Sequence, residues 1–393
     1  MIDIFLWILN SRILVLIILI IIVSFHTIQH IRRDRKLIKN IDAMKEPTNV
    51  SVTDLKYIPL VNIIIPAWKE GKIFKGCLEA LNNLKYPSVR VIVNAGGNDE
   101  TIEIANSFKK YKNFTILNQK AGEGKLRAIN DCLDYVTEGV VHLIDADVYL
   151  NDESIIRMIL PIVNQKEVLV VSALKPHKSI INKAIVKFIY INRNNRFRKR
   201  LSRYSSRVVG PNTAIKYDII NKIGKFTEKR KHDDGRSIFM DINALGFKIY
   251  HIINYETASF NFPFKVKDYL HQNVRWIENN LHFSMQTKNW IRFLKLFFLV
   301  VYSLYIIIFP IFLLFNLNLF YIGLLVLLSL YLKKLRKIIF YIISTEKEKR
   351  MKLGFIFYVE IIFYSYVEVF MNIYVLIEFV FFRKRYKMRK NIE

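Results

Sequence analysis

Long apolar stretches towards both ends of the chain constrain its fold more than any other feature of the sequence. Residues 4–25 are almost entirely apolar, with Arg12 as the only charge, and a second apolar block runs from Ile291 to Leu332. In a helix that rises about 1.5 Å per residue, about 20 residues cross the roughly 30 Å apolar core of a membrane. The sequence therefore predicts a membrane-bound protein with a soluble domain between the two apolar regions.

Basic residues next to the first apolar stretch predict its direction. They follow the stretch instead of preceding it: Arg32, Arg33, Arg35, Lys36 and Lys39. A cleavable signal peptide has the opposite order and a shorter apolar run, so we expect a retained anchor over residues 1–30 and a basic linker over 31–57. The positive-inside rule then predicts a multi-pass protein of the plasma membrane whose soluble domain is cytoplasmic.

The last region, residues 291–393, is predicted to be a second membrane region with basic cytosolic segments. Pro310 and the polar residues 316–318 interrupt its first block, which favours a helical hairpin. The apolar run Leu353–Phe382 has basic residues on both sides, so one crossing, a re-entrant hairpin and an interfacial helix remain open. Its three glutamates fall within about 80° on one helix face, turned either to protein or to a channel. These are Glu360, Glu368 and Glu378.

Between the apolar regions, residues 58–290 alternate short β-branched runs with helical patterns. The predicted strands are Val61–Ile65, Val89–Val93, Phe114–Leu117, Val140–Ile144 and Val168–Ser172. This alternation is typical of an α/β fold with a mostly parallel sheet and helices on both faces. Ligands of such sheets bind at the carboxyl ends of the strands.

Polar, glycine-rich or acidic segments follow four of these strands. The segments are Pro66–Glu70, Asn94–Thr101, Gln119–Lys125 and Asp145–Asp147. Two carboxylates at positions i and i+2 after a buried strand repel one another unless a cation offsets their charge. Hard oxygen ligands suit Mg²⁺ or Mn²⁺ holding phosphates, so Asp145 and Asp147 indicate a metal site. A solvated acidic turn is the alternative interpretation.

In this order, the segments resemble glycosyltransferase family 2, in particular the membrane-embedded synthases of cellulose, chitin, hyaluronan and poly-N-acetylglucosamine. The resemblance extends from about Val61 to Trp290. It implies a nucleotide-diphospho-sugar transferase (GT-A, Rossmann-like) fold with flanking transmembrane helices, and it implies a nucleotide-sugar donor, expected to be a UDP-sugar. The residues expected to bind this donor are Pro66, Glu70, Asn94, Gly96, Asp99, Lys125 and Asp145, and the expected metal ligands are Asp145 and Asp147.

Three later segments are similar to the acceptor side of the same family. Residues 208–215 look like its acceptor segment, which implies contacts from Gly210 and Asn212. Asp234 stands where the family has its general base, with Asp233 as competitor for that role and a helix N-cap as the alternative interpretation of Asp234.

The third acceptor-side segment matches the Gln-x-x-Arg-Trp motif associated with processive synthases. Its residues are Gln272, Arg275 and Trp276. Arg275 is suited to binding a diphosphate and Trp276 to stacking on a sugar ring, while a membrane-interface anchor is the alternative for Trp276. Two departures from the family pattern affect base recognition and processivity: Ala95 replaces a common aspartate, and no glycine follows soon after Trp276.

The net charge of +27 has two readings, nucleic-acid binding or contact with a membrane surface. Residues 58–180 hold 15 basic against 14 acidic side chains, whereas residues 181–292 hold 22 against 8. The densest cluster is Arg193, Arg196, Arg198, Lys199, Arg200, Arg203 and Arg207, which suits anionic lipid headgroups or an anionic acceptor. Because nucleic-acid binding requires neither an anchor nor an acidic pair, we expect no nucleic-acid partner.

The sequence thus predicts a membrane-bound, metal-dependent inverting glycosyltransferase that extends a polysaccharide. Transfer of a single sugar to a polyprenyl phosphate or a glycolipid is the alternative within the same enzyme class. A non-catalytic membrane transport or scaffold protein is the alternative of another class, and Ala95 is the residue that favours it.

Overall fold

The fold was analysed in a computed structural model that describes residues 12–43, 47, 49–199, 204–205, 212–226, 236–286, 290–346 and 350–381. Its contacts divide the chain into two units. The described parts of Ala43–Asn182 and Arg196–Phe262 form one unit, here called the sheet unit. Those of Met1–Asp42, Lys183–Asn195 and Pro263–Tyr386 form the other, here called the helical unit.

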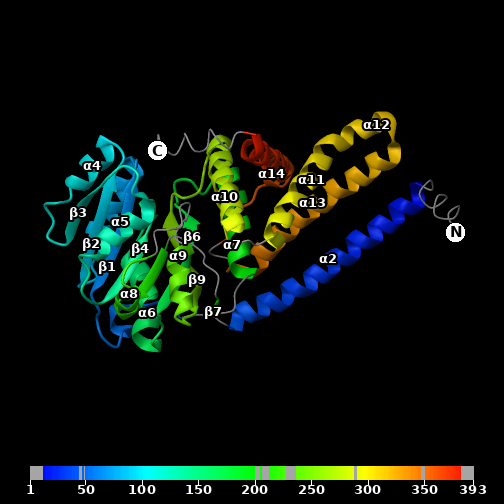
Figure 1. Cartoon of the computed structure of the whole chain (residues 1–393). Coiled ribbons are helices and arrows are strands. Elements are labelled where there is room, and N and C mark those ends of the chain that lie inside the picture. The colour runs from blue at the N-terminus through cyan, green and yellow to red at the C-terminus, as the bar shows by residue number, and fades with distance from the viewer. Residues whose placement is uncertain are drawn as a thin grey trace. The chain divides into compact units, whose positions relative to one another are not determined.

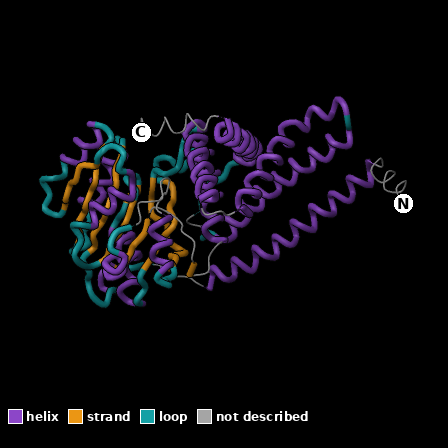
Figure 2. Tube along the Cα trace, in the orientation of Figure 1, coloured by secondary structure: helices purple, strands orange, loops and turns teal. Residues whose placement is uncertain are grey.

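The sheet unit is built on one mixed sheet (Figures 1 and 2). Its strands are β1 (Val61–Trp68), β2 (Val89–Gly96), β3 (Phe114–Gln119), β4 (Val140–Ile144), β5 (Val148–Tyr149), β6 (Leu169–Pro176), β7 (Tyr204–Ser205), β8 (Asn212–Lys216) and β9 (Ile249–Ser259). They follow the order β3-β2-β1-β4-β8-β6-β9-β5, and β7 pairs with β9. The first four are parallel to one another, whereas β8 lies antiparallel between β4 and β6.

All five predicted strands are present, and the sheet is mostly parallel, as expected: β1 pairs in parallel with β2 and β4, β2 with β3, and β6 with β9. Strands β8 and β9 were not predicted, and the antiparallel β8 reverses strand direction in the middle of the sheet. Its sequence, Asn212-Thr-Ala-Ile-Lys216, is short and only half apolar, so it lacks the β-branched run that marks the other strands. The α/β fold class itself is confirmed.

Helices cover both faces of the sheet because alternate residues of each strand point to opposite faces. The helices of this unit are α3 (Lys72–Asn82), α4 (Asp99–Asn106), α5 (Gly124–Leu133), α6 (Asp152–Gln165), α8 (Tyr217–Ile223) and α9 (Arg236–Ala244). In β1, Ile63 and Ile65 belong to one buried cluster with α3 and α6. Ile64 belongs to a second cluster with α5, α8 and α9. The central strands are thus buried on both faces, which agrees with their continuous apolar sequences.

The helical unit consists mainly of helices (Figure 1). They are α2 (Arg12–Ala43), α7 (Ala184–Lys199), α10 (Val266–Gln286), α11 (Trp290–Ile308), α12 (Phe312–Phe315), α13 (Leu317–Ser344) and α14 (Phe355–Phe381), and a 3₁₀ turn, η2 (Phe309–Ile311), follows α11. The end of α7 passes into the sheet unit.

The predicted hairpin over the second apolar block is confirmed. The chain turns at Asn316, whose side chain caps α13 by accepting from the backbone N–H groups of Asn318 and Leu319 at 3.1 Å. The re-entrant hairpin considered for Leu353–Phe382 is wrong, because Phe355–Phe381 is one uninterrupted helix. Residues 1–11 of the predicted N-terminal anchor lie outside the described residues.

Buried charges of the helical unit are paired. The Lys334 ammonium donates to the Glu368 carboxylate, and the Tyr269 hydroxyl donates to the same carboxylate at 3.1 Å. The Arg336 guanidinium binds both oxygens of Asp34, at 2.7 and 3.1 Å. Glu368 therefore faces protein, which is one of the two orientations considered for the three glutamates. Lys334–Glu368 connects α13 with α14, Tyr269–Glu368 connects α10 with α14, and Arg336–Asp34 connects α13 with α2.

Gly139 is required by a close backbone approach at the start of β4. Its φ is +86°, and a Cβ there would lie 2.1 Å from the carbonyl oxygen of Leu60. Gly224 has a similar φ of +78° but open space around it. We expect Gly139→Ala to destabilise the protein by about 2–5 kcal/mol, the sum of the left-handed strain and the overpacking. Gly224→Ala should cost only about 1–2 kcal/mol.

Thermal unfolding of both purified variants measures this difference. Equal shifts of Tm for the two variants would contradict the role given to the contact with Leu60.

Candidate functional site

The predicted donor-binding segments after β1 and β2 lie side by side. In the parallel register, Pro66 pairs with Asn94 and Trp68 with Gly96, so both segments begin inside the strands and not after them. Gly96 is tightly enclosed, because a Cβ there would lie 2.4 Å from the carbonyl oxygen of Gln119. The strand ends are thus packed too closely for any residue larger than glycine at this position.

The backbone of Glu70 is hydrogen-bonded to the first turn of α4. The Glu70 N–H donates to the Thr101 hydroxyl at 2.7 Å, and the side-chain Oδ1 of Asn98 accepts from the Thr101 N–H at 3.1 Å. Asn98 is therefore the N-cap of α4, and Asp99, one of the residues expected to bind the donor, is the first residue of this helix. Asp99 itself is exposed.

Two residues expected near the nucleotide have buried side chains. Asn94 is 1% exposed, and its amide donates to the carbonyl oxygen of Ala128 in α5 at 3.3 Å. Ala95 is fully buried in the apolar core. An ionised aspartate would be costly at this buried position, which gives a physical reason for the departure from the family pattern.

Lys125 connects the segment after β3 to the acidic turn after β4. It lies at the beginning of α5, and its ammonium donates to Oδ1 of Asp145. Both side chains are partly exposed, Lys125 at 37% and Asp145 at 25%. The two predicted donor-binding residues are thus brought together, and the ammonium partly offsets the charge of the acidic turn.

Asp147 is held in place between β4 and β9. Its Oδ1 accepts from the Ser259 hydroxyl at 3.2 Å, and its carbonyl oxygen accepts from the N–H of Phe260 at 2.9 Å. Burial, together with the negative charges of Asp145 and Glu70, raises the pKa of Asp147 to about 7. The two other carboxylates thus act on Asp147 in the same direction, and Lys125 is the cation that lowers this pKa.

This donor set fits a hard divalent cation. Within the part of the chain that the structure describes, no group of three or more His, Cys, Asp or Glu side chains has the geometry of a complete metal site. Asp145 and Asp147 provide carboxylate oxygens, and Mg²⁺ typically binds one or two carboxylates while phosphates and waters complete its shell. Such a cation would also relieve the repulsion that acts on Asp147.

Sequence reasoning did not identify an aromatic group next to Asp147. The rings of Tyr149, His177 and Phe260 contact one another, and His177 stacks on Phe260 with centroids 4.4 Å apart. His177 directly follows β6, so the rule of inspecting strand ends could have found it. Phe260 follows β9, a strand that was not predicted although β-branched and aromatic residues are frequent in its sequence.

Asn212, expected on the acceptor side, is fully buried in β8. Its amide donates to the hydroxyls of Ser172 and Thr257 at 2.6 and 2.8 Å, and its carbonyl oxygen lies 2.6 Å from Nε2 of His142. Burial lowers the pKa of His142 to about 4, so this buried network is neutral at pH 7. Gly210, Asp233 and Asp234 lie outside the described residues.

The Gln-x-x-Arg-Trp residues belong to the helical unit, whereas the donor-side residues belong to the sheet unit. Gln272 and Trp276 are partly buried on α10, and Arg275 is exposed. Arg193 of α7 donates to Oε1 of Gln272 at 2.5 Å, and its guanidinium lies 4.7 Å from the centroid of the Trp276 ring. This contact was not predicted, because Arg193 and Gln272 are 79 positions apart and no local pattern relates them.

A mixed α/β sheet with glycine-rich strand ends and an acidic pair beside a lysine is the arrangement of a GT-A nucleotide-sugar transferase domain. Residues 62–245 match the family model described as Glycosyl transferase family 2. The chain therefore carries a family 2 glycosyltransferase domain, and the resemblance in its sequence is confirmed.

Two curated proteins are similar to parts of the chain. The probable glycosyltransferase YdaM of Bacillus subtilis (strain 168) is 27% identical over 244 residues, which are 58% of this chain and 56% of that protein. The poly-beta-1,6-N-acetyl-D-glucosamine synthase of Staphylococcus epidermidis is 27% identical over 100 residues, 25% of this chain and 24% of that protein. The chain thus spans about half the length of the first relative and about a quarter of the second.

Among solved structures, the mannosyltransferase PcManGT from Pyrobaculum calidifontis in complex with GDP-Man and Mn²⁺ is similar over 71% of this chain and 76% of that chain. The sequence identity is 17% and the TM-score is 0.49.

The repulsion at Asp147 leads to a stability prediction. Asp147→Asn removes one of three neighbouring negative charges and keeps an oxygen that accepts from Ser259. We expect the metal-free variant to be more stable than the wild type by about 1 kcal/mol, a rise in Tm of about 2–4 °C. Mn²⁺ should raise the Tm of the wild type and not that of the variant.

Thermal unfolding in EDTA and in Mn²⁺ measures both effects. The control is Asp218→Asn, which neutralises an exposed carboxylate paired with Lys216 and should change neither value. A lower Tm for metal-free Asp147→Asn would contradict the repulsion argument.

Proposed function

We propose that the protein is a membrane-bound, metal-dependent inverting glycosyltransferase that transfers a sugar from a nucleotide-sugar donor to a growing polysaccharide. The observation that carries this proposal is the acidic turn after β4 within a family 2 domain: Asp145 binds Lys125, and the charges of Asp145 and Glu70 help to raise the pKa of the buried Asp147. A degenerate, non-catalytic domain has no need to keep mutually repelling carboxylates together, which argues against a scaffold.

On the donor side, Asp145 and Asp147 would hold Mg²⁺ or Mn²⁺. When bound, this ion neutralises charge on the donor diphosphate and so stabilises the leaving group. Lys125 provides a protein cation next to the same place and can act on the same developing charge. Glu70 and the closely packed backbone at Gly96 are the remaining groups that we assign to donor binding.

On the acceptor side, Asp234 is proposed as the general base, with Asp233 as its competitor. The base accepts the proton of an acceptor hydroxyl while the hydroxyl oxygen attacks the anomeric carbon of the donor sugar. A carbon–oxygen bond forms on one face of the sugar as the bond to the diphosphate breaks on the opposite face. The configuration of the sugar is therefore inverted, and the nucleoside diphosphate leaves.

The polysaccharide product is inferred from α10. Gln272, Arg275 and Trp276 match the motif of processive synthases, and one relative is a poly-beta-1,6-N-acetyl-D-glucosamine synthase. We assign Trp276 to stacking on an acceptor sugar and Arg275 to the diphosphate. Transfer of one sugar to a polyprenyl phosphate or a glycolipid is the second candidate, favoured by Ile277-Glu278-Asn279-Asn280, which lacks the glycine found in many synthases.

Attachment to the plasma membrane is inferred from exposed apolar helices. Among the described residues, Leu317–Ser344 and Phe355–Val375 are long and apolar enough to cross a membrane. Large apolar side chains are exposed on and near these helices, including Phe315 at 82% and Phe355 at 83%. Such a surface is unfavourable in water and favourable in lipid. With the basic flanks, this supports lipids as partners and a cytoplasmic catalytic domain.

Transfer activity tests the enzymatic part of the proposal. Membranes containing the protein should transfer sugar from one of a panel of radiolabelled sugar nucleotides only with Mg²⁺ or Mn²⁺, and EDTA should abolish transfer. Asp147→Asn and Asp234→Asn should each lower the initial rate at least about 100-fold, because each removes a charge that acts in the transition state. Asp218→Asn should keep the wild-type rate, and sizing of the product distinguishes a polymer from a single transfer.

Wild-type rates in either active-site variant would refute the assignment. Transfer that persists in EDTA would refute the metal dependence alone.

Extraction tests the membrane part separately. After cell fractionation, the full chain should stay in the membrane pellet in alkaline carbonate and dissolve only in detergent, because buried apolar helices do not respond to loss of charge attraction. Release into the carbonate supernatant would contradict spanning helices and indicate a peripheral protein.

A further inference from the structure

Helix α7 carries the beginning of the densest basic cluster, but the described part of this helix is largely buried. Phe188, Ile189 and Ile191 are each 3% exposed, and Asn195 is 1% exposed. A helix that lies on lipid headgroups has an apolar face towards the lipid and exposed charges on the other. Arg193, the first arginine of the cluster, is therefore expected to have its partners within the protein and not among lipid headgroups.

Arg193 contacts two residues of the Gln-x-x-Arg-Trp motif at once. Its Nη2 donates to Oε1 of Gln272, and its guanidinium lies over the ring of Trp276. Gln272 and Trp276 are four positions apart on α10 and so share one helix face. Arg275, the third motif residue, is exposed. A single guanidinium thus holds the two motif residues on this face.

This contact restricts how both side chains can act. The hydrogen bond to Arg193 turns the carbonyl oxygen of Gln272 towards the guanidinium and its NH₂ group away from it. A cation over an aromatic face stabilises one orientation of the ring and occupies that face, so a sugar can stack only on the opposite face. Arg is suited to both tasks because its guanidinium is planar, always charged and a multiple donor.

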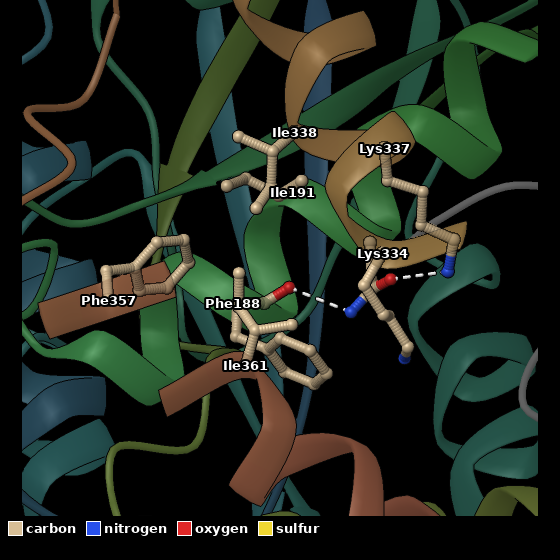
Figure 3. Close-up of a pocket in the computed structure, with 8 residues that line it drawn as sticks. Phe188, Ile191, Lys334, Lys337, Ile338, Phe357 and Ile361 are labelled. Atoms are coloured by element: carbon tan, nitrogen blue, oxygen red, sulfur yellow. Dashed lines mark hydrogen bonds between the residues drawn. The ribbon is translucent and has the colours of Figure 1, made fainter. Parts of the chain in front are cut away.

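The backbone around Arg193 is itself fixed by α13. The Lys337 ammonium donates to Oδ1 of Asn192 at 2.6 Å, and the Asn195 amide donates to the Lys337 carbonyl oxygen at 2.6 Å. The Lys334 ammonium lies 4.7 Å from the ring of Phe188. Figure 3 shows Lys334 and Lys337 next to Phe188 and Ile191, around a small pocket that Ile338, Phe357 and Ile361 also line. Contacts with α13 thus hold the part of α7 from which Arg193 reaches α10.

We propose that Arg193 is a positioning residue for the acceptor: it fixes Gln272 and Trp276 in the orientation in which they bind the glycan. The inference rests on the proposed function, in which α10 contacts the acceptor. Arg193 acts through its two partners and is not assigned any contact with the donor. Its replacement should therefore change the use of acceptor and leave the use of donor unchanged.

Steady-state kinetics on the full chain in membranes or detergent tests the proposal, with the sugar nucleotide and a defined acceptor oligosaccharide varied separately. Arg193→Gln should raise the KM for acceptor about tenfold and shorten the products, because a charge-assisted hydrogen bond and a cation–π contact are lost. The KM for donor should stay at the wild-type value. Arg193→Lys keeps a cation over Trp276 but not the planar fork, so it should show an intermediate acceptor KM.

Lys187→Gln is the matched control. It removes a cation from the same helix, one whose ammonium donates to the carbonyl oxygen of Lys352 and not to α10. Its KM values should equal those of the wild type. In a Trp276→Ala background, Arg193→Gln should cause a smaller further change than in the wild type, because only the contact with Gln272 is left to lose.

Three results would overturn the proposal: an unchanged acceptor KM in Arg193→Gln, equal changes in the donor and acceptor KM, or full additivity with Trp276→Ala. If Arg193→Gln does not fold, the Arg193→Lys variant decides in its place by the same KM comparison. Failure of the proposed function is recognised separately, because then the wild type itself transfers no sugar from any nucleotide donor.

Discussion

Repulsion between carboxylates at the edge of a buried sheet is the constraint on which the donor site depends. The ionised form of Asp147 would be more stable if Asp145 and Glu70 were further away. The register of β1 and β4 and the hydrogen bond from Ser259 nevertheless hold these segments in place. Lys125 offsets only part of the charge. The nearby Cys77 thiol adds none, because burial raises its pKa well above the usual range. The fold therefore maintains a local electrostatic cost that a bound cation would remove.

In the helical unit, in contrast to the donor site, buried charged side chains are paired with opposite charges of the protein. Lys334 with Glu368, and Arg336 with Asp34, are direct pairs between helices. Removing one partner of such a pair leaves a buried charge without compensation, so these contacts fix which helices are neighbours. Tyr269 of α10 donates to Glu368, and Gln272 one turn later accepts from Arg193 of α7. The position of the motif helix therefore depends on polar contacts with α14 and α7.

Local sequence patterns predicted most strands and helices. They did not predict features that depend on contacts between distant parts of the chain. The five strands that were predicted are rich in β-branched residues, and the helix break at Asn316 follows from local polar residues and capping. In contrast, the burial of Asn212 depends on Ser172 and Thr257, which lie 40 and 45 positions away. Asn98 caps α4 through the local N–H of Thr101, whereas the Thr101 hydroxyl accepts from the N–H of Glu70, 31 positions away. Asp145 and Asp147 could be predicted as a pair because they are only two positions apart in the sequence.

The uneven distribution of charge can now be related to these contacts. The half of the domain that carries the acidic pair is nearly neutral, with 15 basic and 14 acidic side chains over residues 58–180, although its carboxylates gather at one edge. Of the 22 basic side chains of residues 181–292, Arg193 contacts α10 and Lys187 binds the carbonyl oxygen of Lys352. A nucleic-acid footprint requires cations on a common exposed face. At least two cations of this region are engaged in holding helices together, so a high positive charge alone does not indicate a nucleic-acid partner here.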